Sequence, residues 1–271
     1  MSVLESLRQQ NFLERLYECD PTLWSDDPRE QAAITNRLGW LEAHRSMLLQ
    51  MRPLAELAAW IRDNEIRHAV LLGMGGSSLA PEVLSRTFGA REGYPELIVL
   101  DTTDPATILR VENRINVVST LFIVSSKSGT TIESASLHRY FAERTQDATG
   151  DTGALQNFIA ITDPGTALHQ AAEAEGFHRV FLNPPDIGGR FSALSFFGLV
   201  PAAAIGIDAQ ELLESAAMVD REEAFELGAR LGELAGQGRD KITFLAASGV
   251  EAFGAWAEQL IAESTGKRGR G

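Results

Sequence analysis

The 271-residue sequence contains a single cysteine, Cys19, and has fewer basic than acidic side chains. One thiol excludes an intrachain disulfide framework and a zinc site built from a cysteine cluster, and it is typical of a reducing compartment. The 24 lysines and arginines are outnumbered by 37 aspartates and glutamates, which gives a formal net charge of −13. A chain this acidic has no general positive field for nucleic acid or for an anionic membrane, so we expect neither as a partner.

Long apolar runs are also missing. No stretch approaches the roughly 20 apolar residues that span a bilayer, and residues 1–8 lack the apolar core of a signal peptide, so we expect a cytoplasmic location. The absence of a G-x-x-x-x-G-K-[ST] pattern excludes a Walker-type nucleotide loop. Hydrophobic residues nevertheless make up 44% of the chain, which is enough to bury a sizeable core.

Short apolar runs alternate with helical segments from residue 68 onward. Helical patterns over about 79–88, 105–114, 131–145 and 165–176 separate the runs. This alternation predicts an α/β fold with a parallel sheet that helices cover on both faces. The predicted strands are Ala69–Leu72, Leu97–Asp101, Thr120–Val124, Phe158–Thr162 and Arg179–Leu182.

The flanking segments are predominantly helical. In residues 1–65 we expect a capping box between Ser2 and Glu5, one periodic helix over 29–49 and a helix opened by Pro53. Downstream we expect helix over 209–234, a strand over Ile242–Ala246 and an amphipathic helix over 250–263, whereas 146–153 is predicted as a polar loop. We therefore divide the chain into a helical segment, 1–65, a sheet domain, 66–205, and the beginning of a second α/β subdomain, 206–271.

Two loops follow predicted strands at the edge where parallel sheets bind ligands. The first, Gly73–Ser78, has glycines that let the backbone approach an anion, and a helix start with free N–H groups comes after it. The second, Ser126–Thr131, combines four hydroxyls, one glycine and one lysine in six residues. Hydroxyls and helix N–H donors suit the several acceptor oxygens of a phosphate monoester.

Each loop also has a purely structural interpretation, because a glycine-rich loop is often only a tight turn and a Ser/Thr cluster is often only a helix cap. A dinucleotide site is a further alternative. Gly73 and Gly75 match the first two positions of G-x-G-x-x-G, and Asp101 stands where a ribose-binding acid is expected. The third position is Ser78, however, and that alternative leaves the hydroxyl-rich loop without a role.

Two later segments hold candidate catalytic side chains. Arg190 follows paired glycines in Gly188–Ser192, where an arginine suits an anionic ligand or intermediate; a surface turn with a salt bridge is the alternative. Glu263 lies near the end of the last helical stretch, in Glu258–Lys267, where a solvated helix end is the alternative.

Taken together and in this order, the four segments resemble the phosphoglucose isomerase (glucose-6-phosphate isomerase) family, which is built from three-layer αβα sugar-isomerase domains with a flavodoxin-like sheet. Residues 23–41 resemble the isomerase half of bifunctional transaldolase/isomerase fusions. The resemblance implies reversible conversion of glucose 6-phosphate to fructose 6-phosphate, a step of glycolysis and gluconeogenesis. It also implies a homodimer in the full-length form, no cofactor and no metal.

The resemblance also implies roles for individual residues. Glu263 would be the base that moves a proton between C1 and C2, for which we expect partial burial, and Arg190 would stabilise the cis-enediolate. Lys127 would act mainly through its backbone N–H. The substrate-binding residues implied are Gly76 and Ser77 along the sugar, and Ser126, Lys127, Ser128 and Thr131 around the phosphate.

The sequence departs from the family pattern after the glutamate motif. Family members continue with a histidine used in ring opening and a late lysine, whereas this chain ends at Gly271 and all five of its histidines precede Glu263. We therefore expect an amino-terminal piece of an isomerase and assign no histidine a role. A non-catalytic sugar-phosphate-binding module with the same fold is the alternative function.

Overall fold

The computed structural model describes residues 2–150 and 152–267. Five strands form one fully parallel sheet in the order β2-β1-β3-β4-β5, which is the flavodoxin-like order. The five strands predicted between residues 69 and 182 are therefore confirmed. Their bounds are β1 His68–Gly73, β2 Glu96–Leu100, β3 Thr120–Ser125, β4 Phe158–Thr162 and β5 Arg179–Leu182.

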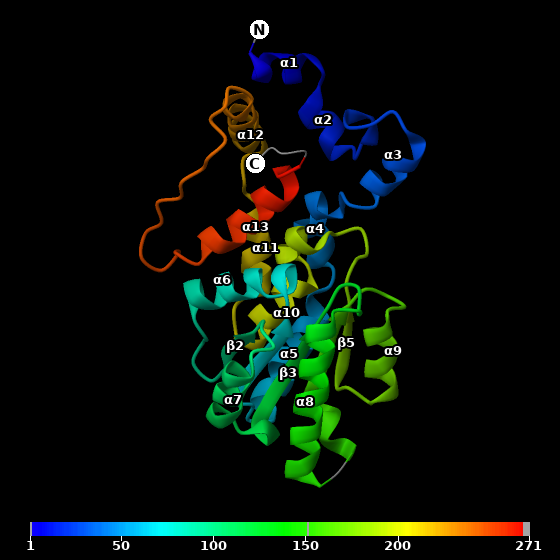
Figure 1. The fold of residues 1–271 in the computed structure, drawn as a ribbon, viewed down its shortest axis with the longest axis vertical. Coiled ribbons are helices and arrows are strands. Elements are labelled where there is room, and N and C mark those ends of the chain that lie inside the picture. Colours follow the sequence, from blue (N-terminus) through cyan, green and yellow to red (C-terminus); the bar gives the residue numbers. More distant parts are fainter. Residues whose placement is uncertain (1, 151, 268–271) are drawn as a thin grey trace.

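Helices surround the sheet and continue beyond it at both ends of the chain (Figure 1). The α-helices are α1 Val3–Gln9, α2 Phe12–Tyr17, α3 Pro28–Thr35, α4 Ala43–Leu48, α5 Met51–Asp63, α6 Leu79–Phe88, α7 Pro105–Arg114, α8 Ile132–Thr149, α9 Ala167–Ala174, α10 Phe196–Ala204, α11 Ala209–Ala217, α12 Arg221–Gly236 and α13 Phe253–Thr265. Short 3₁₀ turns are η1 Pro21–Leu23, η2 Gly39–Glu42, η3 Gly75–Ser77, η4 Val117–Ser119, η5 Thr152–Asn157 and η6 Gly189–Leu194.

Two hydrophobic cores lie on opposite faces of the sheet, because successive strand side chains point to opposite sides. In β1, Ala69 and Leu71 join the core formed with α5, α10 and α11, while Val70 and Leu72 join the core formed with α7, α8 and α9. Figure 1 shows α8 in front of the strands and α5 behind them. This arrangement confirms the three-layer αβα architecture.

The amino-terminal helices confirm one local prediction and correct another. Ser2 and Glu5 form the expected capping box. The single helix expected over 29–49 is wrong, because α3 ends at Thr35 and the chain turns through η2 before α4. The break has a tertiary cause: the Gly39 N–H donates to the Asp186 carbonyl at 3.2 Å, and a Cβ at Gly39 would lie 2.3 Å from the Asp186 carboxylate.

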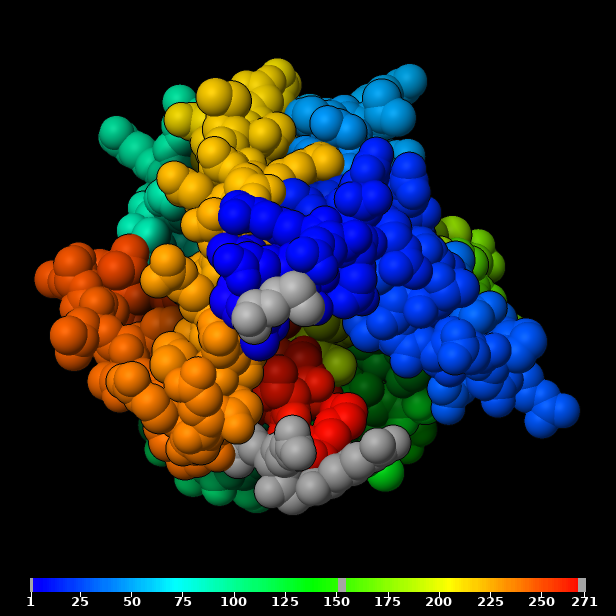
Figure 2. Space-filling view, turned by 90° about the horizontal axis from the view of Figure 1, so that it is seen from above, coloured from blue at the N-terminus to red at the C-terminus, as the bar shows by residue number. Residues whose placement is uncertain are grey.

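Helices α1 and α2 pack against α12, far away in the sequence. Arg8 forms an ion pair with Glu226 at 2.6 Å, and the rings of Phe12 and Phe225 stack at 6.1 Å. Seen from above in Figure 2, the blue amino-terminal helices lie against the yellow-to-orange α11–α12 stretch. Helices α1 and α2 are thus held by a helix that follows the sheet.

The strand predicted over Ile242–Ala246 is wrong. Residues 239–248 contain no helix or strand, and Leu245 is 96% exposed. Figure 1 shows this orange segment looping out from the body of the protein between α12 and α13. A strand requires a neighbouring strand for its backbone hydrogen bonds, and no described strand pairs with this segment.

The polar loop predicted over 146–153 is also partly wrong, because α8 continues to Thr149. Gly150 then ends the helix with a left-handed φ of 69°, as glycine commonly does at a helix C-terminus. Asp151, in the same predicted loop, lies outside the described residues.

Gly198 and Gly228 give a matched test of packing. A Cβ at Gly198, in the completely buried helix α10, would lie 1.9 Å from the Ala193 carbonyl oxygen, whereas a Cβ at Gly228 in α12 meets nothing within 4 Å. We expect Gly198→Ala to destabilise the protein by about 3 kcal/mol and Gly228→Ala to stabilise it by about 1 kcal/mol. Urea unfolding measures both; equal effects of the two substitutions would contradict this packing.

Burial makes the stability of the protein depend on pH. It lowers the pKa of His138, whose ring packs edge-on against Phe158 and Phe177, although the nearby Glu175 carboxylate acts in the opposite direction. As the pH falls, the imidazole of His138 is therefore protonated at a higher pH in the unfolded chain than in the folded chain. The stability associated with neutral His138 is fully present above about pH 6.5, and it decreases as the pH falls below that value. We expect His138→Gln to lose less stability than the unchanged protein between pH 7.5 and 5.5. Urea midpoints at both pH values measure this, and an equal loss would contradict it.

Candidate active site

The loop after β1 is shaped by close backbone approaches. Gly75 has a left-handed φ of 54°, and a Cβ at Gly76 would lie 2.6 Å from the carbonyl group of Gly189. The Ser78 side chain is completely buried, and its hydroxyl donates to the Gly75 carbonyl at 3.1 Å. The residue at the third position of the G-x-G-x-x-G comparison therefore stabilises this turn, which does not favour the dinucleotide alternative.

The hydroxyl-rich loop after β3 is held together by its own side chains. The Ser126 and Thr131 hydroxyl oxygens share a hydrogen bond at 2.9 Å, and the Gly129 N–H donates to the Ser126 hydroxyl at 3.1 Å. A second pair, Ser128 and Thr130, lies 2.8 Å apart. The loop is thus a preformed cluster of hydroxyl groups.

The cluster lies at the positive end of a long helix. Thr131 is the N-cap residue of the 18-residue helix α8, and its side chain makes no capping hydrogen bond. The first-turn N–H groups of a helix have no intrahelical partner, and the helix dipole attracts negative charge to them. Hydroxyls and N–H donors together make this helix start suitable for an anion.

Lys127 is the exception within this loop. Its ammonium forms an ion pair with the Asp163 carboxylate and donates to the Pro185 carbonyl at 3.0 Å. Burial raises the pKa of Asp163, while the Lys127 hydrogen bond acts in the opposite direction. The lysine side chain is therefore engaged with the loops after β4 and β5.

Arg190 and Glu263 lie close together although 73 positions separate them in the sequence. The Arg190 Nε donates to the Ser264 hydroxyl at 2.8 Å, and a guanidinium nitrogen lies 3.7 Å from the Glu263 carboxylate. The guanidinium also stacks over Phe191 at 5.0 Å, and Phe191 stacks on Trp40. The Glu263 side chain is 55% exposed, so the partial burial expected of it is largely absent.

Contacts between loops connect these groups. The Ser192 hydroxyl donates to the Gly76 carbonyl at 3.3 Å, which places the glycine loop beside η6 and Arg190. At the end of β3, the Ser125 hydroxyl donates to the Ser77 carbonyl at 3.5 Å. Gly76, Ser77, Arg190 and Glu263 thus form one connected region, and the hydroxyl-rich loop begins directly beside it.

Two side chains near this region that each have a buried polar atom were missed by the sequence analysis. Among the described residues, neither the Gln259 Oε1 nor the Ser134 hydroxyl has a hydrogen-bond partner. Gln259 approaches Gly75 and precedes Glu263 by one helical turn, so helical spacing from Glu263 was the signal that could have found it. Ser134 follows Thr131 by one turn of α8 in the same way.

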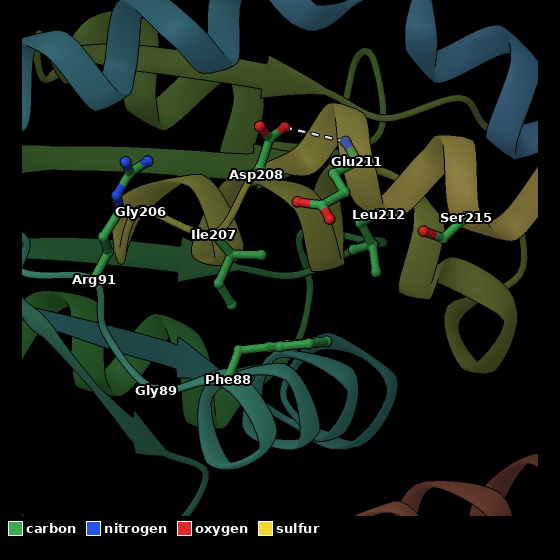
Figure 3. A pocket seen from close by; sticks show the side chains of 9 residues that line it. All are labelled: Phe88, Gly89, Arg91, Gly206, Ile207, Asp208, Glu211, Leu212 and Ser215. Carbon is green, nitrogen blue, oxygen red and sulfur yellow. Dashed lines mark hydrogen bonds between the residues drawn. The ribbon is translucent and has the colours of Figure 1, made fainter.

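Cavities lie on both sides of the sheet. One of about 160 Å³ is lined by Ser126, Thr131, Ser134 and His138, but not by Arg190 or Glu263. A larger one, of about 470 Å³, lies between the end of α6 and the start of α11 and contains none of the predicted site residues (Figure 3). Figure 3 shows the Asp208 carboxylate accepting from the Glu211 N–H, so this helix start is already capped.

Metal centres and membrane spans are both absent from the part of the chain that the structure describes. No group of three or more histidine, cysteine, aspartate or glutamate side chains in 2–150 and 152–267 could hold a metal ion. None of the helices described is both long and apolar enough to cross a membrane.

Comparison with known proteins identifies the family. The family model described as phosphoglucose isomerase matches residues 47–227. A glucose-6-phosphate isomerase from Rubrobacter xylanophilus is 33% identical over 266 residues, covering 90% of this chain and 61% of that protein. A probable glucose-6-phosphate isomerase from Haloquadratum walsbyi is 35% identical, covering 97% of this chain and 61% of that protein.

Solved structures agree with the sequence comparisons. A glucose-6-phosphate isomerase from Chlamydia trachomatis superposes with a TM-score of 0.69 at 26% identity, covering 93% of this chain and 49% of that one. A hypothetical protein from Thermus thermophilus superposes with a TM-score of 0.76 at 27% identity, covering 97% of this chain and 62% of that one. The chain spans 61% of the length of each of the two curated relatives described above. By sequence and by fold, it belongs to the phosphoglucose isomerase family.

Proposed function

We propose that this chain binds a six-carbon sugar phosphate and carries catalytic groups for the interconversion of glucose 6-phosphate and fructose 6-phosphate. The observation that carries the proposal is that the glycine loop, at one sheet edge, contacts both the strand leading into the hydroxyl-lined helix start and the segment that holds Arg190 beside Glu263. The family membership and the names of the relatives support the same reaction.

The phosphate would be held by the loop after β3. The Ser126, Ser128 and Thr131 hydroxyls donate to its oxygens, together with the backbone N–H of Lys127. Hydrogen bonds within the loop hold Ser126 beside Thr131 and Ser128 beside Thr130, which supports a preformed set of hydroxyls for one ligand. Binding the phosphate there is remote from the reacting carbons, so its binding energy serves to orient them.

The sugar would extend from the phosphate along the glycine loop toward α13. Gly76 and Ser77 line it, and the Gln259 side chain lies beside this path, where it approaches Gly75. Glu263 takes the C2 proton of the aldose and returns it to C1, while the O2 hydroxyl proton passes to O1. Arg190 stabilises the negative charge of the cis-enediolate between these steps. A guanidinium suits that task because it stays protonated at any physiological pH.

A general base accounts for only a small part of the rate acceleration that is usual for an enzyme, so most of it must come from orientation and charge stabilisation. A positioned general base contributes roughly 10²–10⁴-fold, whereas enzymes accelerate reactions by about 10⁶-fold or more. Binding through the phosphate and the Arg190 charge must therefore supply the remainder. The reaction moves hydrogen between adjacent carbons with no net oxidation, so the proposed chemistry requires no electron-carrying cofactor.

The division into 1–65, 66–205 and 206–271, a cytoplasmic location and a homodimer in the full-length form remain part of the proposal. All five strands fall within the middle segment, which supports it. Helix α5 belongs to the first segment by sequence, but its Leu54 and Leu57 share a core with β1.

A non-catalytic sugar-phosphate-binding module is the second candidate. It is favoured by one observation: the Glu263 carboxylate is 55% exposed and lies beside Arg190, a geometry that also suits an ordinary surface ion pair. Binding of a sugar phosphate without proton transfer would identify this alternative.

The phosphate-binding loop is tested by the double substitution Ser128→Ala and Thr131→Val. Each lost hydrogen bond to a charged group costs about 1.5–3 kcal/mol, so we expect the affinity for fructose 6-phosphate to fall by roughly 100-fold or more. Calorimetric titration measures the affinity. Ser136→Ala, which removes a hydroxyl from the exposed side of α8, is the control and should leave it unchanged. Unaltered affinity in the double variant would place the phosphate elsewhere.

The catalytic base is tested by proton exchange. In deuterated water, the chain should exchange the carbon-bound hydrogen of fructose 6-phosphate at C1, which NMR spectroscopy follows. We expect Glu263→Gln to reduce the exchange rate by roughly 10²–10⁴-fold, which is the usual contribution of a general base.

Glu258→Gln, an exposed glutamate on the same helix, is the matched control for that experiment. It should retain the full exchange rate. Binding without exchange in the unchanged chain would favour the non-catalytic module, and exchange that survives Glu263→Gln would assign the base to another residue.

A further inference from the structure

The Lys127 side chain crosses between loops instead of facing the hydroxyls around it. Its ammonium contacts the Asp163 carboxylate and the Pro185 carbonyl. Both charged side chains are largely removed from solvent, with 22% of Lys127 and 18% of Asp163 exposed. Lys127 therefore joins the loop after β3 to the loops after β4 and β5.

The main chain of Lys127 is fixed by the same neighbours. Its carbonyl accepts from the Asp163 N–H at 3.2 Å and from the Thr162 hydroxyl at 3.4 Å. Just before it, the Ser126 N–H donates to the Ile161 carbonyl at 3.0 Å. The start of the hydroxyl-rich loop is thus anchored to the end of β4 by backbone and side chain together.

The other end of the connection leads to Arg190. Pro185 belongs to the segment that runs from β5 into η6, where Arg190 is the second residue. The Asn183 N–H donates to the Thr162 carbonyl at 2.8 Å, so this segment also starts from the end of β4. The lysine ammonium spans the remaining gap between the phosphate loop and the arginine loop.

A direct role for the ammonium at the phosphate is disfavoured by its partners. Lysine is a suitable point charge for phosphate, but to reach it Lys127 would have to leave Asp163. The Asp163 Oδ1 already has no partner among the described residues. Removing the ammonium as well would leave a largely buried carboxylate with only the more distant positive charge of Arg37 to stabilise it, which is unfavourable.

We propose that Asp163 is a positioning residue that, through Lys127, sets the separation between the hydroxyl-rich loop and Arg190. This inference rests on the proposed function, because the separation matters only for a ligand that reaches both loops. Inorganic phosphate requires the hydroxyl-rich loop alone, whereas fructose 6-phosphate extends from that loop to Arg190. The two ligands therefore report on different consequences of breaking the ion pair.

The test compares the affinities of the full chain for fructose 6-phosphate and inorganic phosphate by calorimetry, in Lys127→Met, Asp163→Asn and the double variant. We expect the ratio of sugar-phosphate to phosphate affinity to fall at least tenfold in each single variant. In the double variant this ratio should fall no further than in the more affected single variant, because both substitutions remove the same connection.

Controls separate positioning from charge and from general stability. Lys127→Arg keeps the ion pair and should retain the ratio within threefold. Lys241→Met removes an exposed lysine paired with Asp240 and should leave both affinities unchanged. If Asp163→Asn does not fold, the comparison of Lys127→Met with Lys127→Arg still gives the answer.

Three results would overturn the inference. An unchanged ratio of sugar-phosphate to phosphate affinity in the folded variants would contradict the inference but not the proposed function. A rise in sugar-phosphate affinity in Asp163→Asn would do the same, because it would mean that the freed Lys127 binds the phosphate directly. Failure of the unchanged chain to bind either ligand would overturn the proposed function and the inference with it.

Discussion

The order of the parallel strands is the constraint on which the candidate site depends. The chain places β2 on one side of β1 and β3 on the other, so the connections after β1 and β3 leave the sheet in opposite directions. At such a switch point the two loops diverge and leave room for a ligand beyond the carboxyl ends of the strands. The glycine loop and the hydroxyl-rich loop are the two connections that meet there.

Other parts of the site are brought to this point by close backbone contacts. Gly76 lets η6 approach until a Cβ would collide with Gly189, and this approach carries Arg190 to the switch point. Helix α13 is in turn held beside η6 by the hydrogen bond from Arg190 to Ser264. A side chain at residue 76 would therefore disturb the positions of both Arg190 and the proposed base, Glu263.

The sequence was sufficient to predict the parts of the fold that depend on local pattern. Runs such as Thr120–Val124 are apolar on both faces, which only a sheet covered on both sides explains, and the loops after them follow from strand direction. The pairing of Arg190 with Glu263 was expected only from the family resemblance, because no local pattern connects residues so far apart.

Two wrong predictions and one missed residue depend on contacts that spacing alone does not specify. The helix predicted over 29–49 is interrupted because Gly39 packs on Asp186, and the apolar segment 242–246 has no described strand beside it. Gln259 carries no motif, and its free amide oxygen is visible only when the neighbours are known. For Lys127 the family resemblance implied a role of the backbone N–H, and only the structure shows that Asp163 is the partner of its side chain.

The central claim is that one ligand occupies both the hydroxyl-rich loop and the Arg190–Glu263 pair. A crystal structure with 5-phosphoarabinonate, a mimic of the enediolate, tests it most directly. The account predicts the phosphate within hydrogen-bond distance of the Ser126, Ser128 and Thr131 hydroxyls, and the carboxylate end beside Arg190. A phosphate bound away from this loop, or an acid end that does not reach Arg190, would contradict it.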